Sequence, residues 1–160
     1  MSQRIRLRVN GVERQAEVPD HLLLVDFLRD ELGLTGAKIG CGYGICGSCT
    51  VILNDQVIKS CITLAAQADG AEVRTVEGIA TPTELHPVQA ALIEKGGYQC
   101  GYCTPGVVMT ATALLAKNPN PSEAEIRAAL AGNLCRCTGY TRIVLAVQHA
   151  ALVMRDRAAD

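Results

Sequence analysis

The first half of the chain alternates apolar and polar residues, as β-strands do. Such alternation runs over residues 4–9 and again over 12–18, with Asn10-Gly11 between the two runs. Asn-Gly at this place is a strong signal for a β-hairpin. Apolar residues at helical spacing follow over 22–32, and Gly33 is a natural end for that helix. We therefore expect a small sheet packed on one helix.

Further strands are predicted along the same half. Residues 50–53 and 56–59 are strand-like and are joined by a turn at Asn54-Asp55. A short helix-like segment at 64–67 comes next, and a last strand is expected at 72–76.

After a linker at 78–85, the apolar period changes from two to about 3.6 residues, which predicts helices. Thr104-Pro105 suits an N-cap followed by a first-turn proline, and Ser122 with Glu125 suits a capping box. Four helices are predicted, at 87–94, 104–117, 122–132 and from 141 onward. Four helices with short turns indicate a small bundle, so the expected fold class is α+β.

Eight cysteines divide the chain into the same two halves. They form two quartets with no cysteine between them: Cys41, Cys46, Cys49 and Cys61, then Cys100, Cys103, Cys135 and Cys137. Each half is under about 80 residues, a size at which metal crosslinks commonly stabilise a marginal core. We therefore expect one metal centre in each half.

The first quartet has the spacing C-x4-C-x2-C with a distant fourth cysteine, the pattern of plant-type 2Fe-2S ferredoxins. Several glycines lie among these cysteines. A loop that wraps a cluster must bend sharply and point backbone N–H groups at sulfur, which glycine permits. Residues 42–47 also read G-x-G-x-x-G. Because they precede a strand and open no helix, a dinucleotide site is not expected.

The second quartet has the spacing C-x2-C-x31-C-x-C. The segment between its two pairs is predicted to form two helices with a turn, so folding it back would bring four thiols to one point. Zinc sites commonly pair two C-x2-C knuckles, whereas an iron-sulfur cluster tolerates C-x-C because its sulfurs bind different irons. Zinc is the main alternative. A thioredoxin-like dithiol at Cys100 and Cys103 is disfavoured because this half is helical.

Charge and composition restrict the possible partners. The formal net charge is -1, with acids and bases interspersed, so no basic face for nucleic acid is expected. No run approaches the roughly 18 apolar residues of a membrane-spanning helix, and the N-terminus lacks an apolar signal core. We therefore expect a cytoplasmic protein with no membrane partner. In that reducing compartment eight cysteines are better explained as ligands than as a secreted disulfide framework, which is the alternative.

The other polar residues give no candidate for substrate chemistry. The sequence contains no Ser/His/Asp set and no convincing pair of carboxylates. Gln99 is a polar residue directly beside Cys100, and the sequence alone leaves it simply exposed. Packing or solvation is the expected role of the remaining candidates: His21, His86, His149, Tyr102, Tyr140, Arg136 and Arg142.

The segments around the cysteines resemble a known family. The motifs are Gly-Cys-Gly at 40–42, Gln-Cys-Gly-Tyr-Cys-Thr-Pro-Gly at 99–106 and Gly-Asn-Leu-Cys-Arg-Cys-Thr-Gly-Tyr at 132–140. Together with the two quartets they strongly resemble the iron-sulfur subunit of the xanthine oxidase family of molybdenum hydroxylases. The resemblance implies a β-grasp, plant-type ferredoxin domain at 1–77, a linker at 78–85 and a four-helix-bundle domain at 86–160, each domain holding one 2Fe-2S cluster.

The same resemblance implies partners and an electron route. A large subunit would carry molybdopterin and molybdenum and a medium subunit would carry FAD, in a heterotrimer or a dimer of heterotrimers. The quartet Cys100, Cys103, Cys135 and Cys137 would lie on the molybdenum side, and the quartet Cys41, Cys46, Cys49 and Cys61 on the flavin side. Gln99 and Cys137 match positions that approach the pterin in the family.

By this likeness the chain is the electron-transfer subunit of an oxidoreductase that acts on an aldehyde, an N-heterocycle, CO or a similar substrate. Electrons removed from the substrate at molybdenum would cross the two clusters to reach FAD. In relatives that reduce 4-hydroxybenzoyl-CoA the flow is reversed, so the resemblance leaves the direction open.

Two other classes of function compete with this interpretation. A free-standing two-cluster 2Fe-2S ferredoxin would serve diffusible partners, but such carriers commonly use a charged docking face, which the low net charge disfavours. A zinc-stapled scaffold would instead give a colourless protein that contains zinc in place of iron and sulfide.

Overall fold

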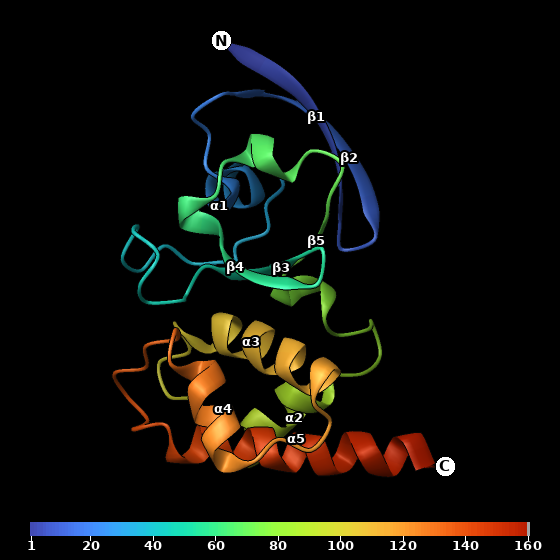
Figure 1. Ribbon diagram of the computed structural model, residues 1–160, viewed down its shortest axis with the longest axis vertical. Coiled ribbons are helices and arrows are strands. Elements are labelled where there is room, and N and C mark those ends of the chain that lie inside the picture. The colour runs from blue at the N-terminus through green and yellow to red at the C-terminus, as the bar shows by residue number, and fades with distance from the viewer. Residues whose placement is uncertain (160) are drawn as a thin grey trace.

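The computed structural model describes residues 1–159, which form two halves shown one above the other in Figure 1. The strands lie in the N-terminal half and the long helices in the C-terminal half. The expected α+β fold class is therefore confirmed.

The N-terminal hairpin forms where the alternating pattern predicts it. Strand β1 (Ser2–Val9) pairs antiparallel with β2 (Val12–Pro19) along their full length. In the turn between them Asn10 has φ +50° and Gly11 has φ +80°. Asn and Gly tolerate this left-handed backbone better than other residues, which is why the pair favours a hairpin turn.

Three further strands complete a mixed five-stranded sheet. These are β3 (Thr50–Leu53), β4 (Gln56–Lys59) and β5 (Glu72–Arg74), and the strand order is β2-β1-β5-β3-β4. Strands β1 and β5 are parallel, whereas the other neighbours are antiparallel. The predicted strands are confirmed, although β5 ends two residues earlier than expected.

The helix predicted after the hairpin is shorter and wider than its sequence suggests. Helix α1 (Leu24–Asp26) continues directly into a π-helical turn at Phe27–Glu31. Its apolar side chains are fully buried between the sheet and a 3-10 turn at Ala65–Ala68. Because Phe27 is the chain's single phenylalanine and is 0% exposed, it anchors the core of this half.

Four helices pack around a second core in the C-terminal half. They are α2 (Pro87–Glu94), α3 (Thr104–Lys117), α4 (Glu123–Leu130) and α5 (Thr141–Ala159). The largest buried side chains of this core are Leu92, Leu115, Ile126, Leu130 and Ile143.

The helix starts confirm one sequence prediction and correct another. Ser122 and Glu125 form the predicted capping box, in which each side chain bonds the backbone N–H of the other. Thr104 was expected to cap α3, and this is wrong. Cys103 already has helical backbone angles, φ -82° and ψ -14°, so Thr104 is the first helical residue and caps nothing.

Helix α3 joins the two halves. Ile52, on the face of β3 that points away from α1, packs with Met109 and Ala113 of α3. Figure 1 shows α3 lying along the sheet half with the other helices beyond it. As a result, the loop that precedes β3 and the loop between α4 and α5 emerge on the same side of the molecule.

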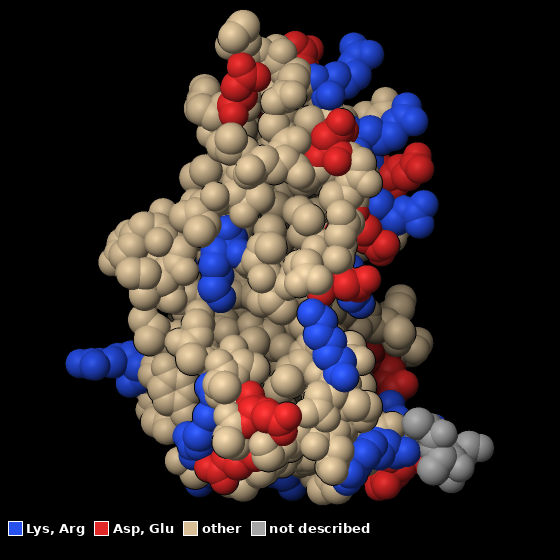
Figure 2. All heavy atoms as spheres, in the orientation of Figure 1, with Lys and Arg blue, Asp and Glu red and all other residues tan. Residues whose placement is uncertain are grey.

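The surface is unevenly charged. Figure 2 shows Lys, Arg, Asp and Glu side chains interspersed along the edge formed by β1 and β2, whereas the opposite side carries few charges around the protruding loops. None of the helices in residues 1–159 combines the length and the apolar character that crossing a bilayer requires.

Candidate metal centres

The first cysteine set comprises Cys41, Cys46, Cys49 and Cys61. Its first three members lie in the loop that leads into β3, and the fourth follows β4. Pairing of β3 with β4 brings the two ends together, because Thr50 is opposite Lys59. Ser60 then donates from its backbone N (3.4 Å) and from Oγ (2.7 Å) to the carbonyl of Cys49. The sheet register therefore places Cys61 beside Cys49.

Backbone N–H groups stabilise negative charge on the first of these sulfurs. The N–H groups of Ile45 and Cys46 point at Cys41 Sγ, with N to S distances of 3.4 Å. Backbone hydrogen bonds, first from Cys46, then from Tyr43 and Ile45, lower the pKa of the Cys41 thiol to about 6. Burial acts oppositely at the other end of the set and raises the pKa of Cys61 to about 11. The loop is thus built to hold sulfur as thiolate, the form that binds metal.

The second cysteine set comprises Cys100, Cys103, Cys135 and Cys137. Cys100 and Cys103 lie between α2 and α3, and the other pair lies between α4 and α5. The helices bring the two loops together, and the Sγ atoms of Cys100 and Cys137 are 3.6 Å apart. The two distant cysteine pairs therefore meet, although their sulfurs form two separate contacts and not the single point that was expected.

A tyrosine holds the loop of Cys135. The hydroxyl of Tyr140 accepts from the backbone N of Cys135 (2.8 Å) and donates to the carbonyl of Asn133 (3.2 Å). Tyr140 itself has φ +68°, a strained backbone for a residue with a bulky side chain. Thr138 Oγ1 lies 3.1 Å from Cys135 Sγ and also accepts from the backbone N of Tyr140. The turn is thus fixed by side chains rather than by regular structure.

In the second set, too, the thiol pKa is raised at some cysteines and lowered at others. Burial raises the pKa of Cys103 to about 12. Burial likewise opposes ionisation of Cys135, but hydrogen bonds from Thr138, Cys137 and Cys103 together outweigh it and leave the pKa of Cys135 lowered. The backbone N–H of Tyr102 lowers the pKa of Cys100. Each set therefore contains sulfurs with donors already directed at them.

The sulfur atoms are arranged in pairs rather than around one point. Side-chain contacts join Cys41 to Cys46 and Cys49 to Cys61 in the first set, and Cys100 to Cys137 and Cys103 to Cys135 in the second. Within residues 1–159 no three His, Cys, Asp or Glu side chains converge as ligands of a single ion. Tetrahedral zinc needs four ligands around one atom, whereas a 2Fe-2S cluster takes two cysteines on each iron. The donor geometry fits the two-iron cluster.

The structure also locates the other residues singled out in the sequence. Gln99 is exposed and donates from Nε2 to the carbonyl of Cys137 (3.1 Å), so it bridges the two loops of the second set. His86 caps α2 by accepting from the backbone N of Val88 (3.2 Å), and His149 pairs with Glu94 (3.0 Å). Both histidines therefore contact helix α2, His86 at its first turn and His149 at its last residue.

Several structural residues were missed from the sequence. Tyr140 was expected only to pack, and Asn133 and Thr138 were not considered. Asn133 and Thr138 each lie within two residues of a cysteine. Short polar side chains in a tight turn commonly form hydrogen bonds with its backbone, so the sequence does contain a signal for these two residues. For Tyr140 the sequence carries no such signal, since its hydroxyl acts on residues five and seven positions earlier.

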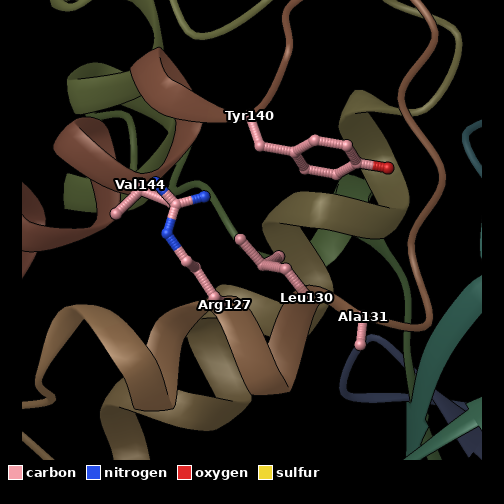
Figure 3. A pocket seen from close by; sticks show the side chains of 5 residues that line it. All are labelled: Arg127, Leu130, Ala131, Tyr140 and Val144. Atoms are coloured by element: carbon pink, nitrogen blue, oxygen red, sulfur yellow. The ribbon is translucent and has the colours of Figure 1, made fainter.

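Tyr140 lines one side of a cavity of about 230 Å³. Figure 3 shows the Tyr140 ring near Leu130 of α4 and Val144 of α5 beside the Arg127 guanidinium, with the Tyr140 hydroxyl pointing away from Arg127. Arg127 is held by Glu123 at 2.8 Å. Tyr140 also packs against the core of the helical half, so its position depends on this contact as well as on the hydrogen bonds of its hydroxyl.

Known families match both halves of the chain. Residues 7–78 match the family described as the 2Fe-2S iron-sulfur cluster binding domain, and residues 75–148 match the 2Fe-2S binding domain. Each match contains one complete cysteine set.

Individual relatives match along nearly the whole chain. The chain is 47% identical to the nicotinate dehydrogenase small FeS subunit of Eubacterium barkeri over 91% of this chain and 93% of that subunit. The crystal structure of quinoline 2-oxidoreductase from Pseudomonas putida 86 has a chain that is 43% identical, with a TM-score of 0.93 and coverage of 98% of this chain and 97% of that chain.

A third relative is a much longer protein. The chain is 45% identical to the aldehyde oxidoreductase of Megalodesulfovibrio gigas over 94% of this chain, but it spans only 17% of that protein. The same two-part unit therefore occurs both as a separate small subunit and as one segment of a larger chain.

Proposed function

Because this chain belongs to the iron-sulfur subunits of the xanthine oxidase family of molybdenum hydroxylases, we propose that it carries electrons through two 2Fe-2S clusters, one in each half. The observation that carries the proposal is the grouping of eight cysteines into two sets, each made of two sulfur pairs. When bound, each cluster supplies a site that accepts one electron and passes it on.

The proposed ligands are the eight cysteines of the two sets. Cys41, Cys46, Cys49 and Cys61 bind the cluster of a β-grasp ferredoxin domain at 1–77, and Cys100, Cys103, Cys135 and Cys137 bind that of a four-helix bundle at 86–160, with a linker at 78–85. The N–H groups directed at Cys41 support this assignment, because donors to sulfur stabilise the added charge of a reduced cluster. The chain's task is to fix distances and tune potentials.

The proposed partners are a large subunit with molybdopterin and molybdenum and a medium subunit with FAD, in a heterotrimer or a dimer of heterotrimers. Gln99 and Cys137 face the pterin in this arrangement, and both are exposed in the isolated chain. The few charges on the loop side suit burial against a partner. Substrate is bound by the large subunit, and the relatives' names, nicotinate dehydrogenase and aldehyde oxidoreductase, suggest an N-heterocycle or an aldehyde.

Purification of the chain at its native expression level tests the proposed partners. The chain should be recovered in a complex that contains molybdenum and flavin, and the visible absorption of its clusters should bleach when a substrate of that complex is added anaerobically. Recovery as a lone coloured monomer would instead favour a free-standing ferredoxin.

A further inference from the structure

The two cysteine sets are joined by a direct backbone contact. The backbone N of Leu134 donates to the carbonyl of Cys46 over 2.8 Å. Leu134 precedes Cys135 in the chain, so Cys46 of the first set and Cys135 of the second are linked by covalent bonds and one hydrogen bond. The shortest bonded path between the two sets therefore crosses a single hydrogen bond, from Leu134 to Cys46.

Glycines allow the backbones to approach this closely. A Cβ atom on Gly106 would lie 2.1 Å from the carbonyl oxygen of Gly47, and one on Gly47 would lie 2.1 Å from the carbonyl oxygen of Gly132. Gly47 also has φ +73°, which a residue with a side chain rarely adopts. The residue next to Cys46 is therefore enclosed by backbone from the helical half.

Asn133 ties these segments together. Its side chain is only 2% exposed, and its Nδ2 donates to the carbonyl of Gly47 (3.1 Å) and to Thr50 Oγ1 (3.4 Å). Its Oδ1 accepts from Thr110 Oγ1 of α3 (2.8 Å). One amide thus binds the first cysteine loop, the start of β3 and α3 at once. A buried polar group with this many partners fixes geometry strongly, because each lost bond leaves a desolvated group.

We propose that Asn133 is a positioning residue that sets the distance and the bonded contact between the two cysteine sets, and so the rate of electron exchange between the clusters. The inference rests on the proposed function. Asn133 touches neither set of sulfurs. It acts by holding Gly47 and Leu134, the neighbours of Cys46 and Cys135, in one rigid unit.

Threonines on α3 provide a matched pair for the test. Thr110 and Thr112 are both nearly buried, at 6% and 8% exposure. Thr110 anchors Asn133, whereas Thr112 Oγ1 has no hydrogen-bond partner within residues 1–159. Thr110→Val therefore removes one of the three hydrogen bonds of the Asn133 amide, and Thr112→Val makes the same chemical change where no hydrogen bond is lost.

The experiment uses the complete complex prepared with Asn133→Leu, Thr110→Val or Thr112→Val. Iron content and the separate paramagnetic resonance signals show whether both clusters are present. The spin–spin interaction between the two reduced clusters and the rate of electron equilibration after flash reduction report the contact between them.

We expect Asn133→Leu to weaken the spin–spin interaction and slow equilibration several-fold, Thr110→Val to do so less, and Thr112→Val to match the unaltered protein. If Asn133→Leu loses iron, the comparison of the two threonine variants decides. An unchanged interaction and rate in Thr110→Val with full iron content would overturn the proposal, as would equal effects of the two threonine substitutions. Absence of two cluster signals in the unaltered protein would contradict the proposed function instead.

Discussion

The two cysteine sets are built in different ways. Three members of the first lie within the nine residues 41–49, so the loop sequence itself gathers them. In the second set 31 residues separate Cys103 from Cys135, and only the packing of α3, α4 and α5 brings the pairs together. Most of the first set is thus gathered by local sequence, and the sheet adds only Cys61. The second set forms only when distant helices pack together.

Exposure separates the sets as well. Cys49 and Cys61 are buried, at 1% and 3%, whereas Cys100 and Cys137 are exposed. Two cysteines of the first set are therefore part of the core of its half, whereas no cysteine of the second set is buried and its turns are held by side-chain hydrogen bonds. Changes far from the cysteines should affect the second set more than the first.

Replacing a proposed ligand gives the largest expected effect. Cys137→Ser should remove the second cluster and leave the first, so the iron content should fall from about four to about two atoms per chain and one of two resonance signals should disappear. Cys49→Ser should remove the other signal and also destabilise the sheet half, because Cys49 belongs to its core. If Cys137→Ser kept both signals, the second ligand set would be wrong.

Gly106→Ala should have the next largest effect. It disturbs the backbone contact between the two halves rather than either cysteine set. The added methyl group must displace the carbonyl of Gly47. Overpacking of this kind costs about 1–3 kcal/mol, and we expect the upper end because backbone must move. The free energy of unfolding, measured by denaturation, should therefore fall, and an unchanged value would show that the two backbones can separate without cost.

Tyr140→Phe should sharpen the difference between the sets. The substitution removes the hydroxyl that binds the backbone N of Cys135, leaving a partly buried N–H without its partner. We expect a loss of about 1–2 kcal/mol of stability, within the usual penalty for an unsatisfied group. The second cluster signal should broaden or be lost more readily on heating, and the first should not change. An equal effect on both signals would show that the two sets are not independent structures.

Ser122→Ala should give the smallest effect and should be confined to the helical half. Loss of this N-cap costs about 1 kcal/mol. The hydrogen bonds of Ser122 lower the pKa of Glu125, so the ionised carboxylate stabilises the helix start above the usual glutamate pKa and this contribution disappears as pH falls through the lowered native value. Thermal unfolding should therefore separate Ser122→Ala from the unaltered protein at neutral pH and less so in acid.

Elements of regular structure could be predicted from the sequence because their signals are local. The Asn10-Gly11 turn, the capping box at Ser122 and the limits of α2 all follow from residues within a few positions of each other. The start of α3 was misplaced by one residue because the loop of the second cysteine set itself already adopts helical backbone at Cys103.

What the sequence could not predict depends on distant contacts. Asn133 meets Gly47 across 86 positions and Tyr102 donates to the carbonyl of Ile39 (2.9 Å) across 63. No periodicity encodes such pairs, so the sequence identifies both cysteine sets but not the residues that hold them together.

Chemical analysis of the complete chain, purified without oxygen, tests the central claim most directly. Two separate 2Fe-2S centres predict about four iron atoms and four acid-labile sulfides per chain. About two of each would leave only one of the sets as a cluster site, and zinc in place of iron and sulfide would contradict the account of both.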